Sequence, residues 1–266
     1  MPELPEVETI RCDLAPLLVG RRITRVTQAL DDPHYRNLYE AAGHRVEALR
    51  RRGKYLIADL GEKELVIHLG MTGQLAIAPT PSAKMRHLHV TFHLDDETAC
   101  YFNDPRRFGW LQVVSPGDYR QIPTLASMGP EPLSPDFALA PFAQRMARAR
   151  TLKPLLLNQK VVAGLGNIYV DEALHLARLH PERGALTRAE SKRLHAAIQE
   201  VLRYGVENRG TTFRDYRDGM GAYGTNQDFL RVFGREGEPC PACGTTIVKT
   251  WLGGRGTHYC PRCQRL

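Results

Sequence analysis

The chain contains 266 residues, of which 42% are hydrophobic and 24% are charged, and its formal net charge at pH 7 is +7. These proportions are those of an ordinary globular protein, and the length suffices for two domains with cores of their own. No apolar run approaches the length of a membrane span, and an N-terminus with an early proline and three glutamates is unlike a signal peptide. We therefore expect a cytoplasmic protein without a membrane partner.

The positive charge is concentrated in the second half of the chain. Residues 1–141 contain 16 lysines and arginines against 18 aspartates and glutamates, whereas residues 142–266 contain 20 against 11. The first part thus carries −2 and the second +9. A basic half of this kind favours a nucleic acid partner, although other anions would also be attracted to it.

The predicted elements begin with a helix and continue as strands. Apolar residues from Val7 to Leu18 recur at helical spacing, and Gly20 would end this helix. Short strand-like segments then follow one another up to residue 114 without intervening helices, which predicts an antiparallel sandwich or barrel and argues against a doubly wound sheet. The expected strands are 23–29, 45–49, 54–60, 64–69, 74–78, 88–94, 99–102 and 108–114.

The pattern becomes helical after a linker. Three prolines within residues 129–135 mark this linker. Thr187 and Glu190 form a capping box that opens a long helix ending near Tyr204. Residues 210–224 are rich in glycine and are predicted to form a mobile loop, and a ribbon ends the chain. The earlier helices are expected over 137–149, 153–159 and 168–178.

Four of the six cysteines have the spacing of a zinc ribbon. Cys240 and Cys243 form one Cys-x2-Cys pair, Cys260 and Cys263 form the other, and sixteen residues separate the pairs. Four thiolates complete a tetrahedral site, so we expect one structural zinc ion and no need for His258 as a ligand. Disulfides are the weaker interpretation in a cytoplasmic chain.

The first residues carry candidate chemistry. Removal of Met1 ahead of Pro2 would leave a terminal secondary amine. A terminal amine has a pKa of about 7.7–8.0 against about 10.4 for lysine, so near neutral pH it holds roughly a hundredfold more free base. Attack on a sugar or carbonyl carbon would give an iminium that withdraws electrons, with Glu3 as a general acid or base. The alternative is that Glu3 only complements the positive end of a helix, and from these residues alone it is the simpler interpretation.

The start of the chain, Met1-Pro-Glu-Leu-Pro-Glu-Val-Glu-Thr9, resembles bacterial formamidopyrimidine-DNA glycosylases. The resemblance covers essentially the whole chain and recurs at Lys54-Tyr55, His68-Leu-Gly-Met71, Asp104-Pro-Arg-Arg-Phe108, Gly164-Leu-Gly-Asn-Ile-Tyr169 and the four cysteines. It implies a bifunctional DNA glycosylase and AP lyase of base excision repair. Such an enzyme excises 8-oxoguanine and formamidopyrimidines from duplex DNA through a Schiff base at Pro2, followed by β- and δ-elimination.

The expected architecture is α+β. An N-terminal helix and an antiparallel β-sandwich would form a catalytic domain over residues 1–130, followed by a linker and first helix over 131–150. The resemblance then implies a helix–two-turn–helix DNA-binding domain over 151–230, and the zinc ribbon would occupy 231–266. We expect this enzyme to act as a monomer on double-stranded DNA.

The resemblance assigns further catalytic and base-reading roles, each beside a simpler alternative. Lys54 would be an active-site lysine close to a phosphate, whereas the plain interpretation is an exposed lysine at a sheet edge. Met71 and Phe108 would fill the gap left by an extruded base, whereas ordinary core packing explains both without DNA. Arg106 would read the orphaned cytosine. Arg255, between the cysteine pairs, would clamp a phosphate and take part in the second elimination, whereas its alternative is a solvated loop arginine.

Three residues are assigned to DNA binding outside the reacting centre. His87 and Arg148 would contact phosphates, and Asn167 would do so at a helix N-terminus with free backbone donors. The turn before Asn167 has an ordinary helix–helix connection as its alternative. His87 also begins a run with His89 and His93 on one strand face, which we interpret as an exposed polar face and not as a metal site.

Two other functions use many of the same features. The sister activity of endonuclease VIII acts on oxidised pyrimidines, but the Pro-Glu-Leu-Pro-Glu-Val start and the Asp-Pro-Arg-Arg-Phe motif favour the purine enzyme. A non-enzymatic zinc-ribbon DNA-binding protein would leave Pro2 and Glu3 without a purpose.

Overall fold

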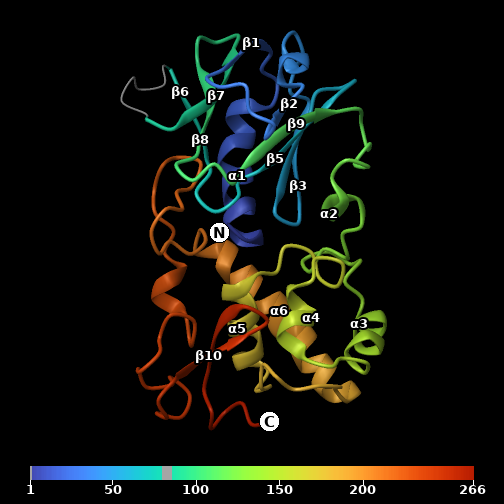
Figure 1. The fold of residues 1–266 in the computed structure, drawn as a ribbon, viewed down its shortest axis with the longest axis vertical. Helices are drawn as coiled ribbons and strands as arrows, with labels where there is room; N and C mark the ends of the chain where they lie inside the picture. The colour runs from blue at the N-terminus through green and yellow to red at the C-terminus, as the bar shows by residue number, and fades with distance from the viewer. Residues whose placement is uncertain (1, 80–85) are drawn as a thin grey trace. The chain divides into compact units, whose positions relative to one another are not determined.

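The computed structural model describes residues 2–79 and 86–266, which form two compact units (Figure 1). The first unit comprises residues 1–126 and 208–227, and the second comprises residues 127–207 and 228–266. The segment 208–227 therefore packs with the N-terminal residues, although along the chain it follows the helices of the second unit. The boundaries expected from the sequence at residues 130, 150 and 230 stay a prediction.

The first unit begins with helix α1 (Leu4–Leu18), as the apolar periodicity predicts. Pro5 lies in the first turn, where its missing N–H is not needed for a helical hydrogen bond. The Glu3 N–H donates to the Glu6 carboxylate at 2.7 Å and completes the start of the helix. One face of α1 is fully buried in the core through Leu4, Val7, Ile10 and Leu14. The helix thus carries the N-terminus on a rigid base.

Two sheets surround this core and confirm the predicted antiparallel sandwich. The first has the strand order β1-β7-β8-β6, and the second has the order β2-β9-β5-β4-β3, in which β2 pairs with β9 in parallel. The short strand β2 was not predicted, because two residues are too few to show an alternating pattern. The strands are β1 (Ile23–Gln28), β2 (Tyr35–Arg36), β3 (Ala48–Arg52), β4 (Tyr55–Asp59), β5 (Glu64–His68), β6 (Gln74–Ala78), β7 (Leu88–Leu94), β8 (Ala99–Asn103) and β9 (Trp110–Val114).

Strand β7 corrects one prediction. His89 was expected on an exposed polar face, but it is buried. The register of β7 shifts between Leu88 and Val90, which is a bulge. The His89 ring stacks on Tyr35 of β2 with 5.8 Å between the ring centroids, and its Nε2 lies 2.9 Å from the Asp104 carbonyl oxygen. Tyr35 of the unpredicted β2 therefore covers part of the β7 face that was expected to be exposed.

The second unit contains the predicted helices and the ribbon. The capping box is present, since the Thr187 N–H donates to Glu190 Oε2 at 2.9 Å and the Glu190 N–H donates back to Thr187 Oγ1 at 3.3 Å. No helix of the described residues has both the length and the apolar character needed to cross a membrane. The elements after β9 are α2 (Pro123–Ala126) in the first unit, then α3 (Leu139–Met146), α4 (Leu152–Leu157), α5 (Asn167–Leu176), α6 (Arg188–Glu207), β10 (Val248–Leu252) and β11 (Arg255–Tyr259).

Candidate functional site

The N-terminus of the first unit brings three candidate side chains into the interior. Pro2 is buried, Glu3 is 3% exposed and Glu6 is 1% exposed. Glu6 Oε2 accepts the Glu3 N–H at 2.7 Å, and Glu6 Oε1 accepts the Thr211 N–H, also at 2.7 Å. One carboxylate therefore orients both the terminus and the start of the 210–224 loop. This role of Glu6 was not predictable from the sequence, because Thr211 lies far away along the chain.

Lys54 lies in the interior and not on an exposed edge. Its side chain is 7% exposed, next to Gly53, whose φ of 56° allows the tight turn between β3 and β4. Burial, and then the charge of Lys54, lowers the pKa of His68 to about 4. His68 Nδ1 also accepts the Gly70 N–H at 3.2 Å, which requires a neutral ring. An exposed edge lysine does not fit these surroundings.

The carboxylate of Asp104 joins two turns of the first unit. Its Oδ2 accepts the Gly109 N–H at 2.7 Å, and its Oδ1 accepts the Arg106 N–H at 3.2 Å and the Thr72 hydroxyl. A side chain at Gly70 would collide with the backbone of residue 108, since its Cβ would lie 2.4 Å from that carbonyl carbon. Asp104 and Gly70 together hold the turn of residues 70–73 against that of residues 104–109.

These turns bring together three residues that were predicted to act on DNA. Met71 is 40% exposed and Phe108 is 51% exposed, so neither is an ordinary core residue. The Arg106 guanidinium lies 4.8 Å from the centroid of the Phe108 ring. His87 is exposed next to the same turn, because its carbonyl oxygen accepts the Asp104 N–H at 3.0 Å. The first unit thus presents a cation, two large apolar side chains and an imidazole on adjoining segments.

In the second unit, a buried ion pair fixes the ribbon hairpin. Lys153 and Asp171 are both fully buried, with 2.7 Å between Nζ and Oδ1. Lys153 Nζ and Asn167 Nδ2 each donate to the Gly256 carbonyl oxygen at 3.0 Å. The His258 N–H donates to Asp171 Oδ2 at 2.9 Å. Strand β11 is therefore fastened to helices α4 and α5.

Asn167 binds the hairpin that carries Arg255. Arg255 is exposed at the start of β11, directly after Gly253 and Gly254, whose positive φ values of 58° and 72° form the hairpin turn. The next residue, Gly256, is the one that Asn167 binds. The Asn167 side chain thus supports the hairpin.

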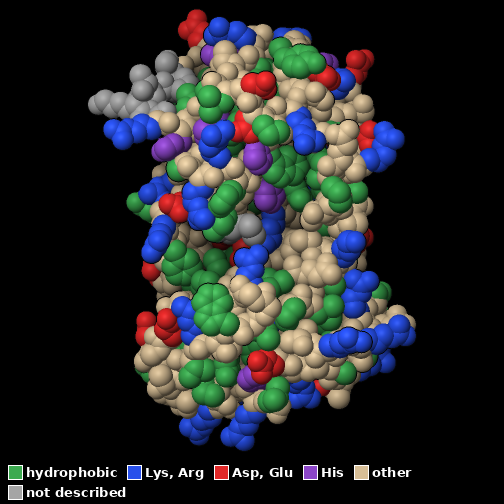
Figure 2. Space-filling view, viewed as in Figure 1, with side chains coloured by type: hydrophobic (Ala, Val, Ile, Leu, Met, Phe, Trp, Pro, Cys, Tyr) green, Lys and Arg blue, Asp and Glu red, His purple; other side chains and the backbone are tan. Residues whose placement is uncertain are grey.

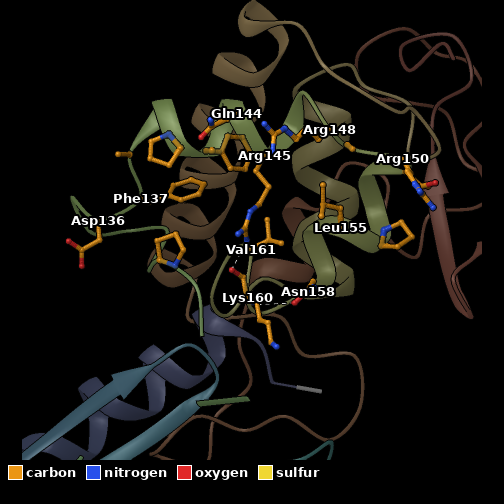
Figure 3. A pocket seen from close by; sticks show the side chains of 17 residues that line it. Asp136, Phe137, Gln144, Arg145, Arg148, Arg150, Leu155, Asn158, Lys160 and Val161 are labelled. Atoms are coloured by element: carbon orange, nitrogen blue, oxygen red, sulfur yellow. Dashed lines mark hydrogen bonds between the residues drawn. The ribbon is translucent and has the colours of Figure 1, made fainter. Parts of the chain in front are cut away.

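Arg148 borders a separate basic cavity of about 1060 Å³ in the second unit. In Figure 2, lysine and arginine side chains gather beside α3 and α4. Figure 3 shows Arg145 extending from α3 toward Lys160, where its Nη1 donates to the Lys160 carbonyl oxygen at 2.9 Å. Arg150 lies at the rim, and apolar side chains such as Val161 line the interior. Of these basic residues only Arg148 was predicted from the sequence, although the net +9 of this half was a signal for the others.

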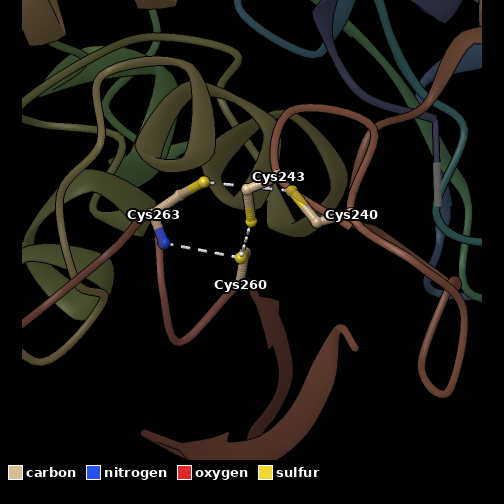
Figure 4. Close-up of side chains that lie close together, drawn as sticks. All are labelled: Cys240, Cys243, Cys260 and Cys263. Carbon is tan, nitrogen blue, oxygen red and sulfur yellow. Dashed lines mark hydrogen bonds between the residues drawn. The ribbon is translucent and has the colours of Figure 1, made fainter. Parts of the chain in front are cut away.

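The four predicted cysteines converge (Figure 4). Their sulfur atoms all lie within 4.8 Å of one another, with 4.0 Å between Cys240 and Cys263 and 3.5 Å between Cys243 and Cys260. A tetrahedral zinc ion with Zn–S bonds of about 2.3 Å holds its sulfurs about 3.8 Å apart, so the cluster fits one zinc ion. Four thiolates leave no open position, and the site is structural. His258 binds Glu236 instead, with 2.9 Å between Nε2 and Oε2.

Three family models match successive parts of the chain. The model described as the formamidopyrimidine-DNA glycosylase N-terminal domain matches residues 1–111. The model of the formamidopyrimidine-DNA glycosylase H2TH domain matches residues 128–217, and that of a zinc finger found in FPG and IleRS matches residues 237–266.

Complete proteins and solved structures are similar over the whole chain. The formamidopyrimidine-DNA glycosylase of Symbiobacterium thermophilum is 50% identical over 99% of this chain and 89% of its own length. That of Deinococcus radiodurans is 49% identical over 100% of this chain and 98% of its own. The crystal structure of MutM (Fpg) from Thermus thermophilus has a TM-score of 0.92 at 49% identity and covers 99% of this chain and 98% of that one. A Lactococcus lactis Fpg variant bound to DNA that contains Fapy-dG has a TM-score of 0.92 at 35% identity, and both chains are covered completely.

Proposed function

Because the chain belongs to the formamidopyrimidine-DNA glycosylase family, we infer that it excises oxidised purines from duplex DNA and cleaves the strand at the resulting abasic site. The substrates are 8-oxoguanine and formamidopyrimidines, and the pathway is base excision repair. Damaged DNA is also the ligand in the similar Lactococcus lactis structure. Since one chain carries the parts matched by all three models, we propose that a monomer in the cytoplasm does this work.

The observation that carries the assignment of the catalytic residues is the burial of Pro2, Glu3 and Glu6 at the N-terminus. Carboxylates that only complement a helix end need no burial, and removing two of them from water is costly. Buried titratable groups beside a potential nucleophile mark a candidate active site. We therefore assign the chemistry to the Pro2 amine after loss of Met1, with Glu3 as its acid–base partner.

The chemistry proceeds in two stages. The Pro2 amine attacks the anomeric carbon of the damaged nucleotide, the bond to the base breaks, and the base leaves with the bonding electrons. Glu3 assists by protonating the leaving base or the sugar ring. The amine loses its proton, and the bond between the anomeric carbon and the ring oxygen then breaks, with the ring oxygen taking up a proton, so that the opened sugar is joined to Pro2 as an iminium. The iminium withdraws electrons, so loss of a proton from the neighbouring sugar carbon expels the 3′ phosphate, and a second elimination expels the 5′ phosphate. Hydrolysis then releases Pro2.

Lys54 of the first unit and Arg255 of the second are each proposed to take part in the chemistry. The burial of Lys54 beside a neutral His68 suits a cation that pairs with a phosphate and donates a proton during elimination. Arg255 is exposed on a hairpin fixed by Lys153 and Asn167, which suits a clamp on a phosphate that leaves in the second elimination.

The remaining residues are proposed to hold and open the duplex. The exposed side chains of Met71 and Phe108 suit wedges that replace the extruded base, and the nearby Arg106 suits a donor to the orphaned cytosine. We assign phosphate contacts to His87, Arg148 and Asn167 with the N-terminus of α5. In Asn167 the backbone is the proposed donor, because its side-chain amide binds Gly256.

A paired substrate assay tests this function. Matched duplexes carry 8-oxoguanine opposite cytosine or an oxidised pyrimidine opposite its partner, and base release is followed under single-turnover conditions. We expect release of the purine at the higher rate. Faster release of the pyrimidine would assign the chain to the endonuclease VIII activity, and specific binding without release of either base would leave a non-enzymatic DNA-binding protein.

A further inference from the structure

The loop of residues 210–224 is closed at its base by hydrogen bonds between its two ends. The Thr225 N–H donates to the Asn208 carbonyl oxygen at 3.0 Å, and the Gly224 N–H donates to Thr212 Oγ1 at 2.9 Å. Near the start of the loop, the Thr211 N–H donates to Glu6 beside the candidate catalytic terminus. Compact loops of this kind, with adjacent ends, often carry function.

The far part of the loop is attached to α1 by an ion-pair cluster of Asp13, Arg209 and Asp218. Arg209 Nη2 lies 3.0 and 2.8 Å from the two carboxylate oxygens of Asp13 and 2.5 Å from Asp218 Oδ2, which also accepts the Arg209 Nε–H at 3.1 Å. The Asp13 side chain is nearly buried and that of Asp218 is buried. Their convergence on one guanidinium means that Arg209 neutralises two neighbouring carboxylates.

The backbone of the loop is built around this cluster. The Gly219 N–H donates to Asp13 Oδ2 at 3.1 Å, and the Met220 and Ala222 N–H groups donate to Asp218 Oδ1 at 3.0 and 2.8 Å. A Cβ at Gly219 would lie 2.7 Å from the Cβ of Asp13. The loop therefore rests directly on α1, with no space for a larger residue at that point.

Arg209 occupies a conformation that favours glycine. Its φ is 58°, in the left-handed region that costs energy for any residue with a Cβ. Such strain persists where surrounding contacts over-determine it, and it is common at functional sites. The contacts of its guanidinium with Asp13 and Asp218 stabilise Arg209 in this conformation.

The attached loop presents unusual side chains for an exposed segment. Phe213, Met220 and Tyr223 are all more than half exposed, and the Arg217 guanidinium lies 3.6 Å from the centroid of the Tyr223 ring. Exposed aromatic and thioether groups near a nucleophile suit contact with the face of an unstacked base. Their positions depend on where the loop rests.

We propose that the Asp13–Arg209–Asp218 cluster holds the 210–224 loop on α1 in the position that receives the extruded base, which makes Arg209 a positioning residue for base excision. The inference rests on the proposed function. Without Arg209 the carboxylates of Asp13 and Asp218 face each other with like charge, and their repulsion lifts the loop away from α1.

Arg209→Gln is the primary test. Single-turnover rates at saturating enzyme are compared on two duplexes, one with 8-oxoguanine opposite cytosine and one with a preformed abasic site. We expect excision of 8-oxoguanine to slow about tenfold, which corresponds to about 1.4 kcal/mol in the barrier. Cleavage of the abasic site should be unchanged, because that substrate has no base for the loop to receive. Amide hydrogen exchange of residues 211–224 should accelerate.

Three further variants separate positioning from stability. Arg209→Gly removes the guanidinium together with the backbone strain, and should slow excision to the same extent as Arg209→Gln with a smaller fall in the melting temperature. Adding Asp13→Asn to Arg209→Gln removes the carboxylate repulsion and should restore part of the excision rate. Gly219→Ala displaces the loop without changing any charge, and should reproduce the selective loss.

Arg120→Gln is the matched control, because it breaks an exposed ion pair with Asp118 in the same unit and should change neither rate. Excision by Arg209→Gln at the wild-type rate would overturn the proposal. An equal loss on both duplexes would also overturn it, since it would show that Arg209 acts on DNA binding or on the chemistry. Failure of the wild-type protein to release 8-oxoguanine would instead contradict the proposed function itself.

Discussion

Glu6 shows how one carboxylate can organise a reacting centre without reacting. Each of its oxygens accepts a backbone N–H at 2.7 Å, one from Glu3 and one from Thr211. Charged acceptors with well-aligned donors form short and strong hydrogen bonds, so the Glu6 side chain has one orientation. The Glu3 backbone, and with it the path of Pro2, is thereby fixed relative to the loop that we expect to meet the base.

Arg106 and Arg148 provide a test of base reading against phosphate binding. Arg106→Ala should reduce discrimination of the base opposite the lesion by about 1–3 kcal/mol, because a good bidentate contact to a base edge supplies that much. Arg148→Ala should weaken binding to all duplexes alike and reduce the slope of log affinity against log salt concentration by about one unit. Binding titrations against each opposing base at several salt concentrations measure both effects.

The two variants act as controls for each other, since both remove one arginine from an exposed position. Identical salt slopes and identical discrimination in both variants would show that the residues do not divide the work in this way.

At the scale of elements, helix α5 anchors the ribbon through two neighbouring carboxylates. Asp171 accepts the His258 N–H, and Glu172 accepts the N–H groups of residues 231, 232 and 233 at 2.8–2.9 Å. These contacts tie the hairpin with Arg255 to the helix whose N-terminus is the proposed phosphate site. The zinc cluster then shapes the ribbon beyond those anchors, with Val232 and Ile247 packed among the cysteines.

Loss of zinc should therefore remove DNA binding and spare the first unit. Structural zinc contributes about 10–16 kcal/mol to the folding of small metal modules, whereas the first unit has a large core of its own. Cys243→Ser should lose the metal and lesion affinity while the N-terminal core stays folded. Zinc content, fluorescence anisotropy with labelled lesion DNA, and hydrogen exchange of the buried strands measure the three outcomes.

Cys12→Ser is the control for this variant, because Cys12 is an exposed thiol outside the cluster and its loss should leave zinc and binding intact. Tight lesion binding by a protein verified to be free of zinc would contradict the expected dependence.

At the scale of the whole molecule, features with a local period or spacing were predictable. Helix α1, the strands β1 and β4 to β9 and the four cysteines each follow from residues close together in the sequence, whereas β3 was expected over 45–49 and lies at Ala48–Arg52. The strand β2, the burial of His89 and the packing of residues 208–227 with the first unit were not predictable in this way. Each depends on partners distant in the chain, and no local pattern encodes them.

In the candidate site, too, local features were predictable and contacts between distant residues were not. Residue chemistry and the family resemblance identified Pro2 and Glu3, but the bridge from Glu6 to Thr211 and the Asp13–Arg209–Asp218 cluster are tertiary contacts. The type of a single residue also does not predict whether its side chain is buried or exposed. The simpler interpretation of Lys54 was an exposed lysine at a sheet edge, but its side chain is buried. The simpler interpretation of Met71 was a core residue, but its side chain is partly exposed.

The nucleophile is the central claim, and borohydride trapping on DNA with 8-oxoguanine tests it most directly. Reduction of the iminium should leave DNA attached to the peptide that begins at Pro2, as mass spectrometry of the digested adduct would show. One residue added ahead of Pro2 turns its amine into an amide, and should abolish both trapping and excision while duplex affinity is largely retained. Lys54 is the competing amine of the first unit. An adduct on Lys54, or full activity with Pro2 blocked, would contradict the assignment of Pro2.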